Sequence, residues 1–193
     1  HIARLKMNIA GIIPARYASS RFPGKPLELL AGKPMIEYVV DQCRLAKRIS
    51  EVIVATDDPR IADAAANFCR VEMTRTDHPS GSDRVAEVAK RCEFDAVVNV
   101  QGDEPLIEPE IIDACVRALQ ASPDAVYSTP VTPFANKSEV TSASRVKCVA
   151  DARGYAMYFS RGMIPGNKHG VPDPRHEYLL HLGLQVYDAA FLK

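Results

Sequence analysis

Three positively charged residues, Arg16, Arg21 and Lys25, lie within ten positions of one another, directly after a short apolar run. Two prolines, Pro14 and Pro23, restrict the backbone of this segment. Guanidinium and ammonium groups held on a stiff loop are suited to binding phosphate oxygens. The alternative is a set of solvated charges on a turn. The spacing therefore indicates a local site for a strongly anionic ligand.

A second polar loop, "NVQGDEP", closes the apolar run of residues 95–100 and exposes Gln101 and Asp103. In open α/β sheets, ligands bind beyond the carboxyl ends of the strands. A carboxylate there can hold Mg²⁺ against phosphate oxygens, although Asp103 could also be a simple turn former or helix cap. Cations and a carboxylate at neighbouring strand ends are typical of nucleoside triphosphate chemistry. Neither a Walker loop nor a G-x-G-x-x-G motif is present.

The elements that would position these loops alternate between β-rich runs and segments of helical period over the first 130 residues. This alternation predicts an α/β fold with a largely parallel sheet covered by helices. Strands are expected at 9–14, 51–56, 71–74, 95–100 and 125–131, with helices from about 35, 59, 82 and 109. The later runs "RVKCVAD", "GYAMYFSR" and "HLGLQVY" predict a smaller, more antiparallel, lid-like region over about 132–193.

The bulk composition excludes several classes of protein. The 193 residues carry 24 Lys and Arg against 24 Asp and Glu, so no global field attracts nucleic acid or a membrane surface. No apolar run approaches the roughly 20 residues that span a bilayer, and no signal peptide is apparent. We therefore expect one cytoplasmic domain whose five cysteines are reduced thiols in the core. Residues 1–8 are set aside as a trimmed or added start.

Six segments then resemble, in order, the motifs of the 3-deoxy-manno-octulosonate (Kdo) cytidylyltransferases, also called CMP-Kdo synthetases. They are "IPARYASSRFPGKPL", "VATDDPRIADAA", "MTRTDHPSGSDRVAEV", "VVNVQGDEP", "VKCVADARGYAMYFSRGMIP" and "HLGLQVY". The resemblance runs from about Ile9 to Phe191. The first and fourth motifs are shared loosely with other sugar-activating cytidylyltransferases, whereas "TRTDHPSGSDR" and "YFSR" are closer to the Kdo branch.

This resemblance implies a Rossmann-like nucleotidyltransferase fold, with a mostly parallel mixed sheet and a smaller antiparallel lid. The implied enzyme depends on Mg²⁺ and forms a homodimer. The anomeric hydroxyl of Kdo would attack the α-phosphorus of CTP, giving CMP-Kdo and pyrophosphate and activating the sugar for lipopolysaccharide synthesis. Arg16 and Lys25 match triphosphate ligands, Arg21 shares their motif, and Asp103 matches the magnesium ligand. Arg16, Lys25 and Asp103 are thus the expected catalytic residues.

The resemblance also implies a nucleotide site made of two loops: Pro14, Ala15, Arg16, Arg21, Lys25, Arg75, Ser80, Gly81 and Arg84. The part in "SGSDR" offers backbone and hydroxyl groups suited to cytosine or ribose. Helix capping by Ser82 is an equal alternative for this loop. His78, in the same loop, is expected to be structural.

The acceptor sugar is expected to contact Gln101, Arg161 and His181, which match Kdo contacts in the family. A guanidinium suits the sugar's carboxylate because it can bind two oxygens at once. The alternative for Arg161 is a solvated charge at a strand end. His181 lies in an alternating strand, and without the resemblance it reads more readily as a structural histidine.

Two departures from the family pattern leave alternatives open. Gln185 stands where a tyrosine is expected against the sugar, so the acceptor could be 8-amino-Kdo or another acidic sugar such as sialic acid. The family continues for roughly fifty residues beyond Lys193, including a second acidic metal ligand. The sequence is therefore expected to be a fragment that binds CTP more readily than it turns it over. A nucleotide-binding protein without catalysis is the alternative from another class.

Overall fold

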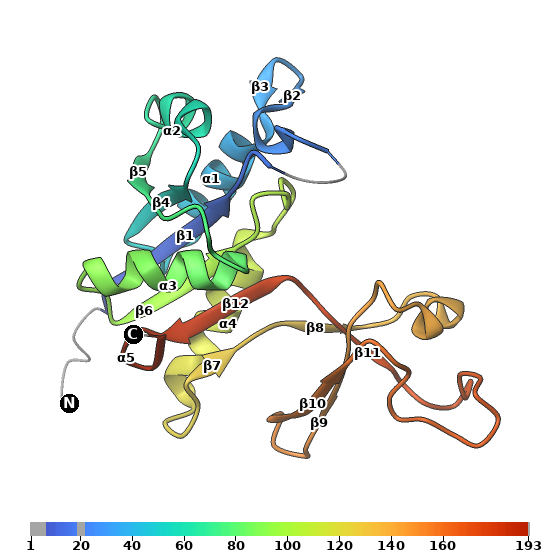
Figure 1. Cartoon of the computed structure of the whole chain (residues 1–193). Coiled ribbons are helices and arrows are strands. Elements are labelled where there is room, and N and C mark those ends of the chain that lie inside the picture. Colours follow the sequence, from blue (N-terminus) through green and yellow to red (C-terminus); the bar gives the residue numbers. More distant parts are fainter. Residues whose placement is uncertain (1–6, 19–21, 193) are drawn as a thin grey trace. The chain divides into compact units, whose positions relative to one another are not determined.

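The computed structural model describes residues 7–18 and 22–192, which form two compact units (Figure 1). Unit 1 contains the described residues up to Ser128 and those from Leu184 onward, and unit 2 spans Thr129–Gly183. The expected lid region of 132–193 is thus divided, because its last residues belong to unit 1.

Unit 1 is built on a six-stranded sheet of the described residues, in the order β5-β4-β1-β6-β12-β7. Its strands are β1 (Ile9–Ala15), β4 (Glu51–Thr56), β5 (Arg70–Met73), β6 (Ala96–Val100), β7 (Tyr127–Ser128) and β12 (Leu184–Asp188). Strands β5, β4, β1 and β6 are parallel, whereas β12 runs antiparallel to both β6 and β7. The predicted mostly parallel mixed sheet is confirmed. A hairpin of β2 (Leu29–Leu30) and β3 (Lys33–Pro34) extends from the loop after β1.

Helices cover both faces of this sheet (Figure 1). They are α1 (Met35–Leu45), α2 (Pro59–Ala65), α3 (Gly81–Arg91), α4 (Pro109–Ala121) and α5 (Ala189–Leu192). Ile9 and Ile13 of β1 pack with α1, α2 and α4, while Ala10 and Ile12 pack with α3 and α5. This alternation is the period of two of a strand buried on both faces. Burying each isoleucine stabilises the fold by about 2 kcal/mol. The strand is therefore firmly anchored, and the loop that follows β1 starts from a fixed position.

The helix starts follow from capping chemistry. Asp58 caps α2 by accepting a hydrogen bond from the Arg60 amide at 2.9 Å, with proline at the first helical position, as predicted. For α3 the cap expected from the sequence, Ser82, is wrong, because the cap lies two residues earlier. Ser80 is the cap, and its hydroxyl accepts from the Asp83 amide at 3.2 Å. Ser82 lies inside the helix, where its hydroxyl accepts from Asn99 instead.

Unit 2 contains a four-stranded antiparallel sheet in the order β10-β9-β11-β8. Its elements are β8 (Val131–Pro133), the 3-10 helix η2 (Lys137–Thr141), β9 (Lys147–Ala150), β10 (Ala156–Ser160) and β11 (Leu179–His181). Phe134, Val140 and Tyr178 form a small core of their own. The smaller antiparallel sheet expected from the sequence is therefore present.

Two predicted strands are each divided at the border between the units. The run 125–131 forms β7 in unit 1 and β8 in unit 2, and "HLGLQVY" is split between β11 and β12. Pro130 lacks an amide for a strand ladder, and its carbonyl accepts from the Leu182 amide at 3.1 Å. The apolar pattern continues across both breaks, so periodicity alone does not show them.

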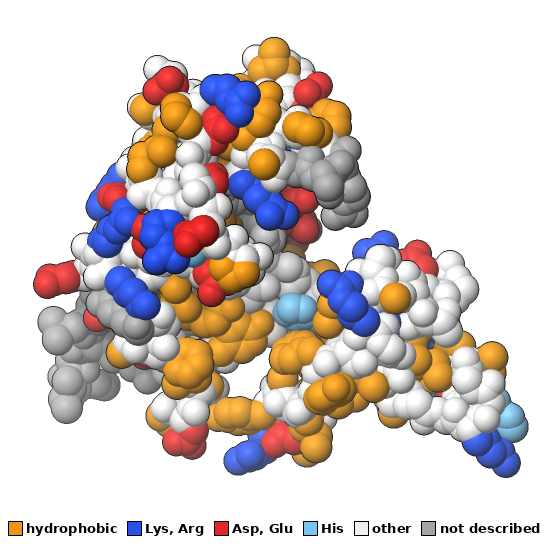
Figure 2. Space-filling view, viewed as in Figure 1, with side chains coloured by type: hydrophobic (Ala, Val, Ile, Leu, Met, Phe, Trp, Pro, Cys, Tyr) orange, Lys and Arg blue, Asp and Glu red, His pale blue; other side chains and the backbone are white. Residues whose placement is uncertain are grey.

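The surface chemistry agrees with the balanced composition. On the face of unit 1 in Figure 2, acidic and basic side chains intermingle without a broad area of one sign. All five cysteines are free thiols, three buried and two half-buried. Within the described ranges, no helix has the length and apolar character needed to cross a bilayer.

Candidate functional site

One pocket in unit 1 lies where β1 and β6 end and α3 begins. Its volume is about 160 Å³, and its lining comprises Pro14, Ala15, Arg16, His78, Pro79, Ser80, Gly81, Arg84 and Gln101. Seven of these nine residues belong to the predicted nucleotide and acceptor sets. The carboxyl ends of two parallel strands and the amino end of a helix meet here because β1 pairs with β6 and α3 packs over both. Amide groups at such a helix start favour an anionic ligand.

Two glycines let the walls of this pocket approach one another. A Cβ at Gly81 would lie 3.2 Å from Pro14 Cγ and 3.9 Å from Gln101 Oε1. A Cβ at Gly102 would lie 3.2 Å from the Pro14 carbonyl oxygen. The two contacts at 3.2 Å are tighter than most real Cβ contacts. The three loops are thus packed against each other through backbone that tolerates little added volume.

Lys25 and Asp103 are in direct contact. Lys25 Nζ lies 2.8 Å from Asp103 Oδ2, although the two residues belong to different loops, and their side chains are 43% and 54% exposed. An ion pair this exposed stabilises the fold little, by about 0–1 kcal/mol. Its main consequence is that a cation and a carboxylate from the two predicted loops share one position at the surface.

The backbone of the first loop is shaped by packing. Gly24 has φ +74°, and a Cβ there would meet the Tyr17 ring at 3.0 Å. The Gly24 amide also donates to the Tyr17 carbonyl at 2.9 Å, just before the 3-10 helix η1 (Lys25–Leu27). On the Tyr17 ring, the Arg60 guanidinium stacks at 3.3 Å from the centroid. Gly24 therefore packs against Tyr17, and this contact fixes the position at which η1 begins with Lys25.

Asp103 is followed in the chain by a second acidic residue, Glu104. Burial and the charge of Asp103 raise the pKa of Glu104. Within the described ranges, no group of three or more His, Cys, Asp or Glu side chains could hold a metal ion. Mg²⁺ is commonly bound through one or two carboxylates, with water and substrate phosphates completing its shell. The exposed carboxylate of Asp103 fits a magnesium ion whose shell is completed by water and substrate, and it does not fit a protein-only cage.

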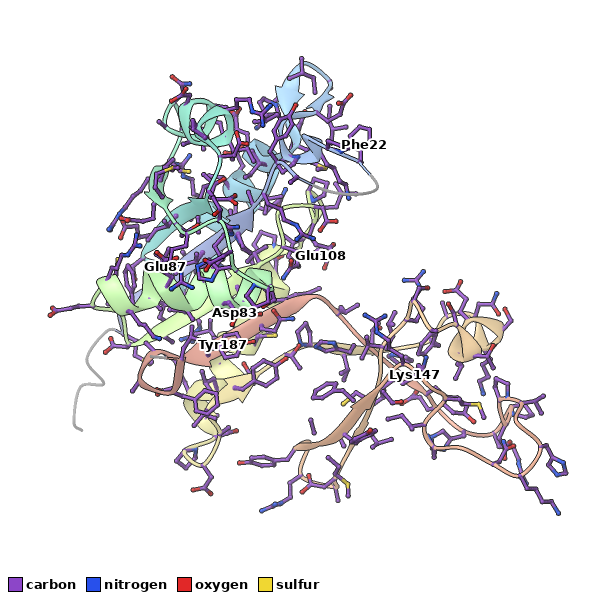
Figure 3. The ribbon with its side chains drawn as sticks, viewed as in Figure 1. Phe22, Asp83, Glu87, Glu108, Lys147 and Tyr187 are labelled. Carbon is purple, nitrogen blue, oxygen red and sulfur yellow. The ribbon has the colours of Figure 1, made fainter. Side chains whose placement is uncertain are left out.

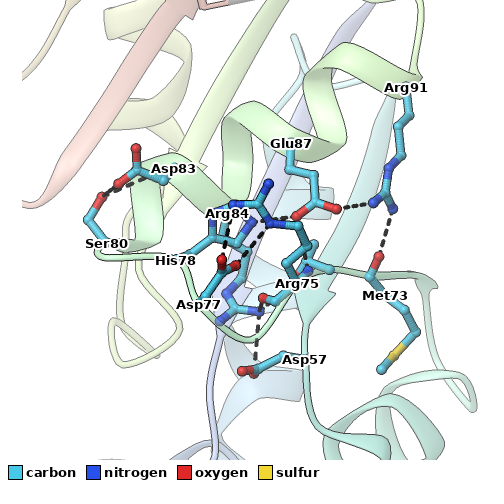
Figure 4. A network of polar contacts seen from close by, with 11 residues as sticks. Asp57, Met73, Arg75, Asp77, His78, Ser80, Asp83, Arg84, Glu87 and Arg91 are labelled. Atoms are coloured by element: carbon cyan, nitrogen blue, oxygen red, sulfur yellow. Dashed lines mark hydrogen bonds and ion pairs between the residues drawn. The ribbon is translucent and has the colours of Figure 1, made fainter.

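The Arg84 side chain is buried and already bound to other protein groups. This limits the part it can take in the predicted recognition of the base. Its side chain is 5% exposed and its Nη1 lies 3.3 Å from Asp57 Oδ1 (Figure 4). The same nitrogen donates to the Thr74 hydroxyl and, at 3.4 Å, to the Arg75 carbonyl. Arg84 lines the pocket, but its charge is already paired. Through its hydrogen bonds to Thr74 and Arg75, Arg84 mainly holds residues 74–75 against α3.

Glu87 on α3 organises the loop that carries the predicted "SGSDR" residues (Figure 4). Its carboxylate accepts from the Arg75 amide at 3.0 Å and contacts both His78 Nε2 and the Arg91 guanidinium. Burial acts to raise the pKa of Glu87, but these hydrogen bonds and positive charges together hold it below its usual value. His78 thus has a structural partner, and it also lines the pocket. The Arg75 side chain is exposed and forms an ion pair with the exposed Asp77, at 2.9 Å.

A buried amide lies behind Gln101. Asn99 on β6 is fully buried, and its Nδ2 donates to Gln185 Oε1 at 2.9 Å and to Ser82 Oγ at 3.2 Å. Gln185 is directly opposite Asn99 in the β6–β12 register. The structure therefore places Gln185 in a polar contact within unit 1. The sequence reading missed Asn99, although one polar residue in the apolar run "AVVNV" was the signal for it.

The remaining acceptor residues belong to unit 2. Arg161 is exposed at the end of β10, and its Nη1 donates to the Ala143 carbonyl at 2.9 Å. His181 Nε2 lies 2.8 Å from the Thr129 hydroxyl, beside the Phe159 ring, and burial lowers the pKa of the imidazole. His181 thus has the partners of a structural histidine. Arg21 lies outside the described residues.

Comparison with known proteins gives consistent similarities. The sequence profile of a family described as cytidylyltransferase matches residues 10–193. A protein of Arabidopsis thaliana named mitochondrial 3-deoxy-manno-octulosonate cytidylyltransferase is 51% identical over 98% of this chain. Proteins of the same enzyme name from Zea mays and Syntrophotalea carbinolica are 52% and 48% identical over 95% and 96% of it. The chain spans 66% and 62% of the two plant proteins and 77% of the bacterial one.

Solved structures show the same relationship. A CMP:2-keto-3-deoxy-manno-octonic acid synthetase complexed with CTP superposes with a TM-score of 0.89 at 39% identity, over 96% of this chain and 76% of that one. A 4-diphosphocytidyl-2C-methyl-D-erythritol synthase from Anaerococcus prevotii reaches 0.60 at 16% identity, over 96% and 72% of the two chains. The second likeness concerns the fold alone.

Proposed function

This chain belongs to the family of 3-deoxy-manno-octulosonate cytidylyltransferases, and from that membership we propose that it takes part in transferring the cytidylyl group of CTP to Kdo. The Kdo anomeric oxygen forms a bond to the α-phosphorus of CTP, and the bond from that phosphorus to the bridging oxygen of the β-phosphate breaks. Pyrophosphate leaves, and the hydroxyl proton is released to solvent. The product, CMP-Kdo, is an activated sugar suited to lipopolysaccharide synthesis.

One observation supports this proposal most directly. A single edge of the sheet in unit 1 carries a pocket lined by Arg16, Gly81 and Gln101 and, from two of the same three loops, the contact between Lys25 and Asp103. Phosphoryl transfer requires little covalent work from a protein, since positioning and charge neutralisation account for most of the catalysis. An edge with cations, helix amides and one carboxylate can both position the triphosphate and neutralise its charge.

Each residue has a role in this proposal. Arg16 and Lys25 neutralise negative charge on the triphosphate, with the strongest effect as charge accumulates on the leaving pyrophosphate. Asp103 would hold Mg²⁺, which when bound neutralises phosphate charge and lowers the pKa of the attacking hydroxyl. Gln101 offers both a donor and an acceptor to sugar hydroxyls. Arg161 and His181 match further Kdo contacts of the family, and the role proposed for the Arg161 guanidinium is to bind the carboxylate of the sugar.

Base and acceptor are tested together by offering CTP, UTP or GTP with Kdo, 8-amino-Kdo or sialic acid and identifying the nucleotide sugar by mass. CMP-Kdo is the expected main product. Gln185 keeps 8-amino-Kdo as a second candidate, because an amide stands where the family pattern has a tyrosine. A product made only from sialic acid, or from UTP, would contradict the proposal.

Catalysis is separated from simple nucleotide binding by Asp103→Asn. The enzyme should lose magnesium-dependent pyrophosphate release while still binding CTP in equilibrium dialysis. Asp63→Asn, which changes an exposed carboxylate on α2, is the matched control and should leave both measurements unchanged. Full activity of the Asp103 variant would remove the proposed metal role. CTP binding with slow pyrophosphate release by the wild-type chain agrees with the proposal, whereas CTP binding with no detectable release would indicate a non-catalytic binder.

Homodimerisation and a cytoplasmic location are further proposals, which rest on the resemblance of the sequence to the family. Light scattering at micromolar concentration should give twice the monomer mass of 21.2 kDa. A monomer mass would refute the dimer. Fractionation of cells expressing the tagged chain tests the location, and it matters because the Arabidopsis relative is named mitochondrial.

A further inference from the structure

Lys147 on β9 is a lysine with no exposed surface. Its ammonium donates to three main-chain carbonyls of unit 2, where Figure 3 labels the residue. The acceptors are the Ser142, Arg145 and Arg161 oxygens, at 2.9, 2.7 and 2.5 Å. Among the residues the structure describes, no carboxylate forms an ion pair with it.

Burying an ammonium is unfavourable unless each of its hydrogens has an acceptor. Lys147 meets that condition, since three donors find three carbonyl oxygens. Burial, and to a smaller extent the nearby charge of Arg161, lower the pKa of Lys147. A neutral amine keeps only two N–H donors, so the arrangement itself requires the charged form to satisfy all three carbonyls.

The three carbonyls define what Lys147 connects. Two of them belong to the segment 142–145, which follows η2, and the third is the backbone oxygen of Arg161. The guanidinium of Arg161 returns to the same segment, because its Nη1 donates to the Ala143 carbonyl at 2.9 Å. Arg161 is therefore fixed at two points. Lys147 holds its backbone and also holds the segment on which its side chain rests.

We propose that Lys147 is a positioning residue for Arg161, and that it sets the guanidinium for the carboxylate of the acceptor sugar. This inference rests on the proposed function, in which Arg161 binds an acidic sugar. One guanidinium nitrogen is engaged by Ala143, and within the described part of the chain Nε and Nη2 form no hydrogen bond, so both can serve two carboxylate oxygens. Lys147 itself never touches the sugar, since it has no exposed surface. Its effect reaches the acceptor only through Arg161.

A double-mutant cycle separates this role from a general structural one. Lys147→Met, Arg161→Gln and the double variant are compared for the KM of Kdo and the KM of CTP in a pyrophosphate release assay. Each single change should raise the KM of Kdo about tenfold, as for loss of one charge-assisted hydrogen bond, with the KM of CTP within twofold of wild type. The double variant should be no worse than Arg161→Gln alone.

Lys137→Met is the matched control. Lys137 lies in the same unit and also donates to a backbone carbonyl, that of Pro174. Among the described residues its side chain forms no ion pair or hydrogen bond with the 142–145 segment or with Arg161. Its KM values should not change. Additive effects of Lys147→Met and Arg161→Gln, or an equal rise in both KM values, would overturn the proposal.

A second variant covers a failure to fold. Lys147→Ala is assayed with and without ethylammonium, which can refill the cavity and restore the three hydrogen bonds. Recovery of the low KM for Kdo supports positioning, whereas a chain that stays unfolded would assign Lys147 to the fold of unit 2 alone and overturn the proposal. If the wild-type chain neither binds nor consumes any acidic sugar, the proposed function fails and this inference falls with it. An active wild type with an additive cycle refutes only the positioning role.

Discussion

Replacing Arg84 by methionine should destabilise unit 1 substantially, because the change leaves Asp57 without its cation. Removing one partner of a buried ion pair costs about 3–5 kcal/mol. The Asp57 side chain is 18% exposed, so water can solvate part of the stranded charge, and the cost should fall near the lower end, about 3 kcal/mol. For a chain of this size that corresponds to a fall in Tm of about 6–12 °C.

The matched control is Arg75→Met. The Arg75 side chain is 68% exposed and its partner Asp77 is 69% exposed, so the loss should stay below about 1 kcal/mol. Far-UV circular dichroism is a suitable signal, because helices α1 to α5 all lie in unit 1. Urea unfolding should show a lower midpoint for the Arg84 variant with an unchanged slope.

The opposite pattern would refute the reasoning. If Arg84→Met unfolds at the wild-type midpoint but binds CTP at least tenfold more weakly, the guanidinium is free to serve the nucleotide and its pairing with Asp57 contributes little. Arg75→Met should weaken CTP binding with little effect on stability, if the exposed guanidinium faces the nucleotide as the resemblance implies.

Three further predictions concern single sites. Gly81→Ala should weaken CTP binding about three- to tenfold in calorimetry, since the new Cβ would lie 3.2 Å from Pro14 Cγ; a large fall in Tm would instead indicate damage to α3. Burial lowers the pKa of His181, so the unfolded chain binds more protons below about pH 6.5 and stability falls there. His181→Gln should reduce that fall between pH 7.5 and 5.5 in urea unfolding, and parallel curves would contradict it. Burial raises the pKa of Cys43 to about 12 and that of Cys115 to about 11, so neither thiol should react with iodoacetamide at pH 8 before unfolding, as mass spectrometry can show.

Periodicity was sufficient to predict four strands of the unit 1 sheet, β1, β4, β5 and β6, and helices α1 to α4, whereas β12 was wrongly assigned to the lid region. β1 is buried along its whole length, and its alternating contacts with two helical layers require the apolar run that the sequence shows. The start of α2 was predictable because Asp58 and Pro59 are strong local signals. Joining the loops of Lys25 and Asp103 needed only the rule that ligand-binding loops meet at the carboxyl edge of a parallel sheet.

The hydrogen-bond and ion-pair partners of individual charged side chains could not be predicted. Arg84 stands in the first turn of an otherwise polar helix segment, a position where arginine is usually solvated, and its partner Asp57 comes from a separate loop. Lys147 lies in β9, yet it is buried because three carbonyls converge on it, two from the segment just before the strand and one from Arg161, fourteen residues further along the chain. Such contacts depend on tertiary placement of backbone oxygens, for which the sequence contains no local signal.

The pairing of β7 with β12 has an evolutionary consequence. The chain leaves unit 1 after Ser128 and re-enters it at Leu184, and these exit and entry strands are neighbours, with Ser128 opposite Val186. A segment inserted between two paired strands can be lengthened, shortened or exchanged while the hydrogen bonds of the unit 1 sheet stay the same. Lineages could therefore diversify the 55 residues of Thr129–Gly183 by recombination and keep an ancestral nucleotide platform intact.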